Sequence, residues 1–175
     1  MIVPGVTVAY TNPVICLEFE GPLEKANRDK LVARINRKDW WHVPPPDAKA
    51  YENRGKFLAS TFREAEFWGR PLDRPIRVNV VNPLIGDEPA IETELLGAPA
   101  EDPGDDYPKL IEWRWKLDAK LKKAALARGY DSICLLSRSS FAKFLAEGKV
   151  PISLELNLLR PECELTGAPQ GSRGT

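Results

Sequence analysis

The sequence predicts an α+β fold, formed by a single domain over residues 1–165. Three observations predict it. Short β-rich runs alternate with helical stretches along the chain, RPIRVNVVNPL (residues 74–84) is a β-branched strand pattern, and residues 108–128 carry apolar side chains at helical spacing. The chain has 175 residues, of which 43% are hydrophobic and 29% charged. This composition is typical of one globular domain with a real core.

Charge and hydropathy argue against a membrane partner and against a global nucleic-acid-binding surface, while a local basic groove stays open. The 25 Lys and Arg residues balance the 25 Asp and Glu residues, so the chain has no global charge that attracts nucleic acid or an anionic membrane. No apolar run approaches the roughly 20 residues that span a bilayer, and the N-terminus lacks the pattern of a secretion signal. We therefore expect a cytoplasmic protein with no membrane partner and make no prediction of oligomeric state.

The cysteines and the single histidine argue against a metal centre. Cys16, Cys134 and Cys163 are odd in number and show no paired spacing, so neither a disulfide framework nor a zinc site is expected. Cys16 and Cys134 lie in apolar runs and should be buried, reduced thiols. A cysteine nucleophile that uses His42 as its base is the minor alternative.

The N-terminal third alternates strand and helix signals. Residues 7–19 predict two short strands around a Thr-Asn-Pro turn, and residues 23–37 predict a charged helix with Leu31 and Ile35 on one side. KDWWHV (residues 38–43) has β-favouring aromatics, and the three prolines that follow must end it because proline cannot donate to a sheet.

The next segment carries capping signals. Asp47 is expected to cap a helix over residues 48–55, which a glycine closes, and residues 56–60 predict a strand. Thr61 and Glu64 form a T-x-x-E capping box, so a helix should begin directly after that strand and continue to the next glycine.

The C-terminal half continues the alternation. After the strand at residues 74–84, ended by Asn-Pro, we expect a helix at 87–97, a loop at 98–106 and the longest helix at 108–128. A strand at 132–136 and a helix at 139–148 follow. The last strand is expected within 151–165, with buried side chains alternating with polar ones; the buried set is Ile152, Leu154, Leu156 and Leu158. Residues 166–175 lack core-forming side chains and are expected to form a mobile tail.

Common catalytic motifs are missing from the sequence. It contains no G-x-G-x-x-G after a strand, no G-x-x-x-x-G-K-[ST], no H-E-x-x-H and no G-x-S-x-G. Dinucleotide-fold redox enzymes, P-loop NTPases, zincins and α/β-hydrolases therefore lose their usual support.

The order of several short segments carries a resemblance. The segments are WWHV, GKFLAST, EAEFWGRP, IRVNVVNPLI, ALARGYDSICLL and LELNLLRP. In this order, over about residues 38–165, they resemble the ADP-ribosyltransferase-like domains of phage, mobile-element and bacterial toxin-related proteins. The strand ending in Asn-Pro-Leu and the Gly-Tyr-Asp strand entry are the most suggestive parts.

The resemblance implies a fold, a substrate and site residues. Such domains bind NAD, as substrate, in a cleft between split antiparallel β-sheets with flanking helices. The histidine of their first motif corresponds to His42, the hydroxyl residue of the second to Ser60 or Thr61, and the late-strand glutamate to Glu155. The resemblance thus implies an enzyme that cleaves the nicotinamide–ribose bond and transfers ADP-ribose to a protein or nucleic-acid acceptor.

This chemistry needs a carboxylate near the ribose. Cleavage builds oxocarbenium-like positive charge on the sugar, and a carboxylate stabilises that charge more in the transition state than in the ground state. Glu155 would take this catalytic role, while His42 and Ser60 would position NAD. Further contacts to phosphate or rings are expected from Arg side chains and aromatics; these candidates are Tyr51, Arg54, Trp68 and Arg70.

A structural role is the alternative for each signature residue. His42 can be a satisfied histidine beside Trp40, and the capping box accounts for Thr61 completely, which favours Ser60 as the pocket hydroxyl. Glu155 lies mid-strand, where glutamate is disfavoured, yet a solvated polar sheet face explains it equally well.

Two departures from the family pattern define the competing hypotheses. Val43 and prolines follow His42 where the family has small residues, and the paired-glutamate loop of arginine-modifying enzymes is missing, so transfer to protein arginine is not expected. The main alternative is a catalytically inactive ADP-ribosyltransferase-like binding module that uses exposed aromatics near Trp40, Trp41 and Trp68. A transferase of RNA 2′-phosphate would share the fold but calls for more basic and histidine residues.

Overall fold

A computed structural model describes residues 22–101 and 103–165. Together these residues form a mixed α+β structure with a four-stranded sheet, which confirms the α+β class; the sheet is not purely antiparallel as expected, because it contains one parallel pair. The helices are α1 (Pro22–Arg37), α2 (Lys49–Arg54), α3 (Phe62–Glu66), α4 (Glu88–Leu96), α5 (Tyr107–Ala127), α6 (Arg138–Glu147) and the 3₁₀ helix η2 (Pro161–Cys163). The strands are β1 (Lys56–Ala59), β2 (Pro83–Gly86), β3 (Ser132–Leu135) and β4 (Glu155–Leu158).

The sheet is mixed and has the strand order β1-β4-β3-β2. β4 pairs antiparallel with β1 on one side and with β3 on the other, while β3 pairs parallel with β2. The register places Glu155 of β4 between Ala59 of β1 and Leu135 of β3. Because directly paired residues point to the same side of a sheet, these three side chains share one face.

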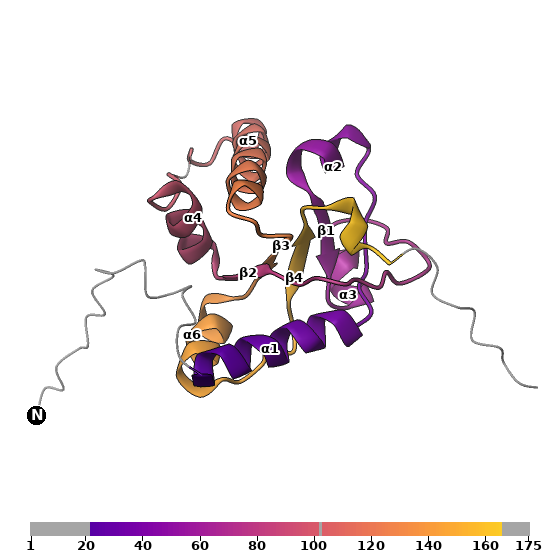
Figure 1. Cartoon of the computed structure of the whole chain (residues 1–175). Helices are drawn as coiled ribbons and strands as arrows, with labels where there is room; N and C mark the ends of the chain where they lie inside the picture. The colour runs from indigo at the N-terminus through magenta and orange to yellow at the C-terminus, as the bar shows by residue number, and fades with distance from the viewer. Residues whose placement is uncertain (1–21, 102, 166–175) are drawn as a thin grey trace, which may run out of the picture.

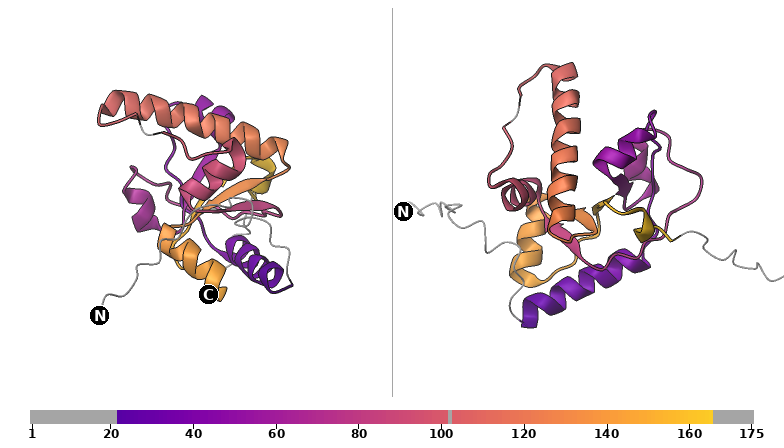
Figure 2. Two further views of the ribbon diagram at one scale, coloured as in Figure 1. Left: turned by 90° about the vertical axis from the view of Figure 1, so that its left-hand side faces the viewer. Right: turned by 45° about the horizontal axis from the view of Figure 1, so that its top comes forward.

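Helices cover both faces of the sheet. In Figure 1, α4 and α5 lie above the sheet and α1 and α6 lie below it, and the views of Figure 2 show the same layers. Strand residues alternate between the two sides: on β3, Cys134 packs into the core under α1 and α6, whereas its neighbour Ile133 packs into the core under α4 and α5.

The core on the α1/α6 side is the larger one and is apolar. It joins Leu31 and Ile35 of α1 to Phe144 of α6 and to Leu58 and Leu156 of the sheet, all of them buried. The expected inward face of the helix at 23–37 is thereby confirmed. At about 25 cal/mol per Å² of apolar surface, each such side chain contributes roughly 1.5–3 kcal/mol when it is buried.

Local capping signals predicted most helix ends correctly. Thr61 accepts a hydrogen bond from the Glu64 amide at 3.1 Å, Asp87 caps α4 through Ala90, and Asp106 caps α5 through Lys109. The predicted stop after α2 is also confirmed, since Gly55 closes that helix. Two details differ: α2 begins at Lys49 with Asp47 bonded to the Lys49 amide, and α3 ends at Glu66, before the expected glycine.

Gly55 is required by its surroundings as well as by its backbone. Its φ of 87° lies in the left-handed region that L side chains rarely adopt. An added Cβ would also lie 2.1 Å from the Asn157 Oδ1 and 2.8 Å from the Leu158 carbonyl oxygen. The close approach of this glycine to β4 therefore leaves no room for a side chain.

The strand predicted at residues 74–84 is wrong in its extent. Its N-terminal part forms only isolated bridges, Ile76 with Trp40 and Val78 with Glu164, and Pro83 begins β2 instead of ending a strand. The β-branched run is nevertheless buried on alternate residues, since Ile76, Val78 and Val80 belong to the core. The β-branched pattern reflects burial of these side chains. No continuous partner strand pairs with the segment, so it forms bridges in place of the predicted strand.

Two other strand predictions need correction. KDWWHV forms bridges at Trp40 and Trp41 and no ladder strand. The last strand is confined to β4, and Ile152, which was expected to be buried, is 78% exposed. The opposite face of β4 is not solvated as the alternative explanation of Glu155 required: Asn157 is buried, and helices α4 and α5 cover this side.

Other predictions fall outside the described part or concern membrane contact. The strands expected at 7–19 and the tail at 166–175 lie outside the described residues. Within the described ranges, no helix combines the length and apolar character that a membrane crossing requires. Beyond β1, the described residues add only the isolated bridges named above and that of Trp41 with Ala59.

Candidate functional site

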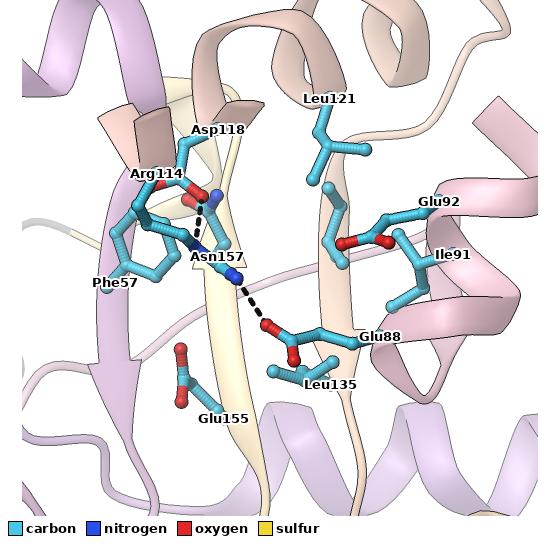
Figure 3. Close-up of a pocket in the computed structure, with 11 residues that line it drawn as sticks. Phe57, Glu88, Ile91, Glu92, Arg114, Asp118, Leu121, Leu135, Glu155 and Asn157 are labelled. Atoms are coloured by element: carbon cyan, nitrogen blue, oxygen red, sulfur yellow. Dashed lines mark hydrogen bonds and ion pairs between the residues drawn. The ribbon is translucent and has the colours of Figure 1, made fainter. Parts of the chain in front are cut away.

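A pocket opens on the sheet face that α4 and α5 cover. It has an empty volume of about 430 Å³, part of which is open solvent. Its floor comes from β1, β3 and β4, and its walls from the two helices (Figure 3). The lining residues are Phe57, Glu88, Ile91, Glu92, Arg114, Asp118, Leu121, Ile133, Leu135, Glu155 and Asn157.

Ion pairs link three helices across one side of this pocket. Asp118 of α5 is buried and accepts hydrogen bonds from Arg54 of α2, at 3.1 Å from Nε and 2.8 Å from Nη2. Its other oxygen accepts from the Arg114 Nε at 3.0 Å, and Arg114 in turn donates through Nη1 to Glu88 of α4. We call this series, Arg54–Asp118–Arg114–Glu88, the ion-pair chain.

Glu155 lies below the ion-pair chain and has no equivalent partner. Figure 3 shows its carboxylate below Phe57 and Arg114 in this view, apart from the dashed contacts of Arg114. Within residues 22–101 and 103–165, no hydrogen bond or ion pair reaches this carboxylate. Burial raises the pKa of Glu155; the nearby Arg114 opposes the shift, and the charges of Glu88, Asp118 and Glu64 add to it.

The walls around Glu155 combine apolar and polar character. Ile133, Leu135 and Ile91 supply apolar surface, and Phe57 supplies an aromatic ring. Asn157, on the same strand face as Glu155, donates from Nδ2 to the Arg54 carbonyl at 3.0 Å, while its buried Oδ1 has no partner among the described residues. The pocket therefore places a carboxylate beside apolar and aromatic surface.

Ser60 is connected to the Glu155 region through Glu64. The buried Ser60 hydroxyl donates to the Glu64 Oε2 at 2.6 Å, and the other carboxylate oxygen accepts from Ser153. Burial acts to raise the pKa of Glu64, but the hydrogen bonds from Ser153, Ser60 and Thr61 outweigh it and lower the pKa. The Ser60 hydroxyl is thus engaged with a carboxylate and does not line the pocket.

His42 is buried with both ring nitrogens in hydrogen-bonding contact. Its Nδ1 lies 2.8 Å from the Phe57 carbonyl oxygen, which can only accept, so Nδ1 carries the proton. Its Nε2 then accepts from the Tyr51 hydroxyl. Burial lowers the pKa of His42, and its bond to Phe57 opposes the shift. His42 therefore holds Tyr51, beside an ion pair of Lys56 and Glu164 at 2.6 Å.

The other predicted contact residues are dispersed. Arg54 belongs to the ion-pair chain and stacks near Phe57 and Trp115. Thr61 caps α3, and Arg70 and Trp68 are exposed, Trp68 by 71%.

Of the three signature side chains, Glu155 lines the pocket, whereas His42 and Ser60 do not. The pocket residues that the sequence-based prediction missed are mainly Glu88, Arg114 and Asp118 on the covering helices. One signal was present in the sequence: Arg114 and Asp118 are spaced i, i+4, and Asp118 stands next to Leu117 in the apolar stripe of α5. A charged residue in such a stripe indicates a paired, buried group.

Cysteine chemistry and metal binding receive no support from the described residues. Cys134 and Cys163 are free thiols in the core, and burial raises their pKa values to about 12 and about 11, so both stay protonated and unreactive. The part of the chain that the structure describes contains no cluster of His, Cys, Asp and Glu that could hold a metal ion.

Comparison of the chain with protein-family models, with curated proteins and with solved structures gave no match in any of the three.

Proposed function

We propose that this protein is an ADP-ribosyltransferase-like enzyme that cleaves NAD and transfers ADP-ribose to a protein or nucleic-acid acceptor. The observation that carries the proposal is Glu155: a carboxylate on a central strand, half-buried in a pocket, without a hydrogen-bond partner in the described part of the chain. Burial raises the pKa of this carboxyl group, and perturbed carboxyl groups in pockets cluster at functional sites.

The pocket suits the nicotinamide–ribose half of NAD. Its lining contains four carboxyl groups (Glu88, Glu92, Asp118 and Glu155) and one guanidinium (Arg114). An excess of carboxylates favours the positively charged pyridinium ring and disfavours the diphosphate. In the proposal, the ring lies against the apolar walls near Phe57, and the diphosphate lies outside this acidic part.

Each group then has a defined role in the reaction. The bond between ribose C1′ and the nicotinamide nitrogen breaks, and its electron pair leaves with nicotinamide. The acceptor forms a new bond to C1′ and loses its proton to solvent. Ionised Glu155 stabilises the positive charge on the ribose between these events. Ser60 positions Glu64 next to Glu155, and His42 positions Tyr51, so both act through another residue.

The pattern of backbone pairings supports the resemblance. Beyond β1, the bridges Trp41–Ala59, Trp40–Ile76 and Val78–Glu164 add short antiparallel pairings to the four-stranded sheet. A second, smaller sheet at this position is what the split arrangement of such domains requires, and we propose that these bridges correspond to it.

Release of nicotinamide from labelled NAD tests the proposal. Purified wild-type protein should release nicotinamide and, with a cell lysate added, transfer label to an acceptor. Glu155→Gln should lower the release by about 100-fold or more, because it removes the charge that stabilises the transition state. Glu147→Gln is the matched control, since Glu147 is exposed at the end of α6 on the opposite side of the sheet. No release by wild type, or equal release by Glu155→Gln, contradicts the proposal.

An inactive binding module is the second candidate, and exposed aromatics favour it. Phe67 and Trp68 are 82% and 71% exposed and contact each other edge to face, with ring centroids 5.1 Å apart. Trp40, which was expected to contribute to this surface, is fully buried, and Trp41 packs against Phe62. Calorimetry separates the candidates: saturable NAD binding without nicotinamide release would support a module, and no binding would exclude NAD as its ligand.

A further inference from the structure

The most informative feature of the pocket beyond Glu155 is the placement of Arg114. Its guanidinium is held from two sides, by Asp118 on its own helix and by Glu88 on α4 (Figure 3). It is also the one basic residue in the lining, and it faces the carboxylate that lacks a partner. A guanidinium in this position interacts with both Glu88 and Glu155 but forms its short contact only with Glu88.

We propose that Arg114 is a positioning residue that controls the charge of Glu155, with Glu88 competing for the same guanidinium. This inference rests on the proposed function for the catalytic importance of Glu155. The contacts of Arg114 do not depend on that function. When Arg114 is bound to Glu88, Glu155 is left in an environment that favours its protonated form. When Arg114 turns towards Glu155, the carboxylate is stabilised in the ionised form that the reaction needs.

The anchoring of the ion-pair chain favours this exchange. Arg54 holds Asp118 by two hydrogen bonds, so Asp118 keeps a cationic partner whichever way Arg114 turns. Glu88 is 52% exposed at the start of α4, where water and the helix dipole stabilise its charge without Arg114. The Arg54–Asp118 end of the ion-pair chain is therefore fixed and buried. The contact between Arg114 and Glu88, at the other end, can break at little cost in free energy.

Among the described residues, the charged groups that act on Glu155 come from three elements. Arg114 and Asp118 belong to α5, Glu88 belongs to α4, and Glu64 belongs to α3. Arg114 is the one cation among them, and it opposes the burial that raises the pKa of Glu155. Removing Arg114 must therefore raise the pKa of Glu155, and removing Glu88 must lower it.

Titration of the Glu155 side chain in the full-length protein tests the inference. The carboxyl carbon is followed by NMR in ¹³C-labelled protein without NAD. Arg114→Gln should raise the pKa of Glu155, and Glu88→Gln should lower it, because the second change removes a like charge and releases Arg114. Arg114→Lys should restore most of the wild-type titration. Lys116→Gln is the control: this exposed residue of α5 pairs with Glu112 and lies outside the lining.

The outcomes separate this inference from the proposed function. An unchanged titration in Arg114→Gln, or shifts of the same sign in both variants, overturns the role of Arg114 even if NAD is cleaved. Opposite shifts support that role even if NAD is not cleaved. If NAD is cleaved, the midpoint of the pH profile of kcat must follow the titration of Glu155 in each variant. If Arg114→Gln does not fold, Glu88→Gln and Arg114→Lys still decide the matter.

Discussion

The two faces of the sheet are built from different side chains. On the side of α1 and α6, the sheet and the helices meet in an apolar core, which joins Leu58 and Leu156 of the strands to Phe144 of α6. On the side of α4 and α5, the same central strand presents Glu155 and Asn157. Both faces are covered by helices, so exposure to water does not explain the difference.

The two faces of β4 therefore differ in what their side chains contribute to stability. An apolar core gains free energy in proportion to the surface that it buries, whereas buried charged groups are neutral or costly unless they are fully paired. Asp118 is fully paired by Arg54 and Arg114, but Glu155 is not. The apolar α1/α6 core and the fully paired Asp118 therefore stabilise the fold. We propose that Glu155, which lacks such pairing, serves function, and we call this the division between stability and function.

Removing the centre of the ion-pair chain should have the largest effect on stability. Asp118→Ala leaves Arg54 and Arg114 without their shared partner and should lower the free energy of unfolding by about 3–5 kcal/mol, measured by urea denaturation. Glu112→Ala removes an exposed carboxylate of the same helix and should cause no measurable change. A loss of unfolding free energy as small as that of the control would show that the ion-pair chain contributes nothing to stability.

Leu156→Ala tests the apolar face. The side chain is fully buried in the α1/α6 core, and its truncation should cost about 3 kcal/mol through lost transfer free energy and the remaining cavity. The same denaturation experiment measures it. Because Leu156 points away from the pocket, nicotinamide release per folded molecule should stay at the wild-type level; a specific loss of activity would contradict the division.

Asn157, which follows Leu156 on β4, should contribute less to stability. Asn157→Ala removes one hydrogen bond to the Arg54 carbonyl and an oxygen that has no partner among the described residues. The expected cost is about 1 kcal/mol, the value of one net hydrogen bond. A cost equal to that of Leu156→Ala would mean that Asn157 contributes as much to folding as the buried leucine beside it.

Glu155→Gln should change stability least and with the opposite sign. The folded-state pKa of Glu155 lies above its unfolded value, so its contribution to stability is present below the unfolded pKa and is lost as the pH rises through the folded pKa. The glutamine variant does not titrate. Its free energy of unfolding should exceed that of wild type at pH 7, and the difference should close in acid. Urea denaturation over a pH series measures it, with Glu147→Gln as a control.

Local signals in the sequence predicted the helices well. Thr61, Asp87 and Gly55 act within a few residues of the chain, so their roles can be predicted without knowing the tertiary structure. The β-branched run at residues 74–84 could not be predicted in this way, because a strand needs a partner. Ile76 and Val78 find single bridges in place of a ladder.

The site was predictable only in part. Glu155 stood out because a mid-strand glutamate is unfavourable, and it does line the pocket. Glu88 and Arg114 come from helices whose distance from β4 no sequence motif encodes. Sequence order also gives no indication that Tyr51 and the Phe57 carbonyl would occupy both ring nitrogens of His42.

A paired measurement on Leu156→Ala and Glu155→Gln tests the central claim most directly. For each variant, the free energy of unfolding and the nicotinamide release from NAD are measured on the same preparation. The account predicts a crossed pattern: Leu156→Ala loses stability and keeps its activity per folded molecule, while Glu155→Gln keeps or gains stability at pH 7 and loses its activity. Variants that lose both properties together, or a Glu155→Gln protein as active as wild type, would contradict the account.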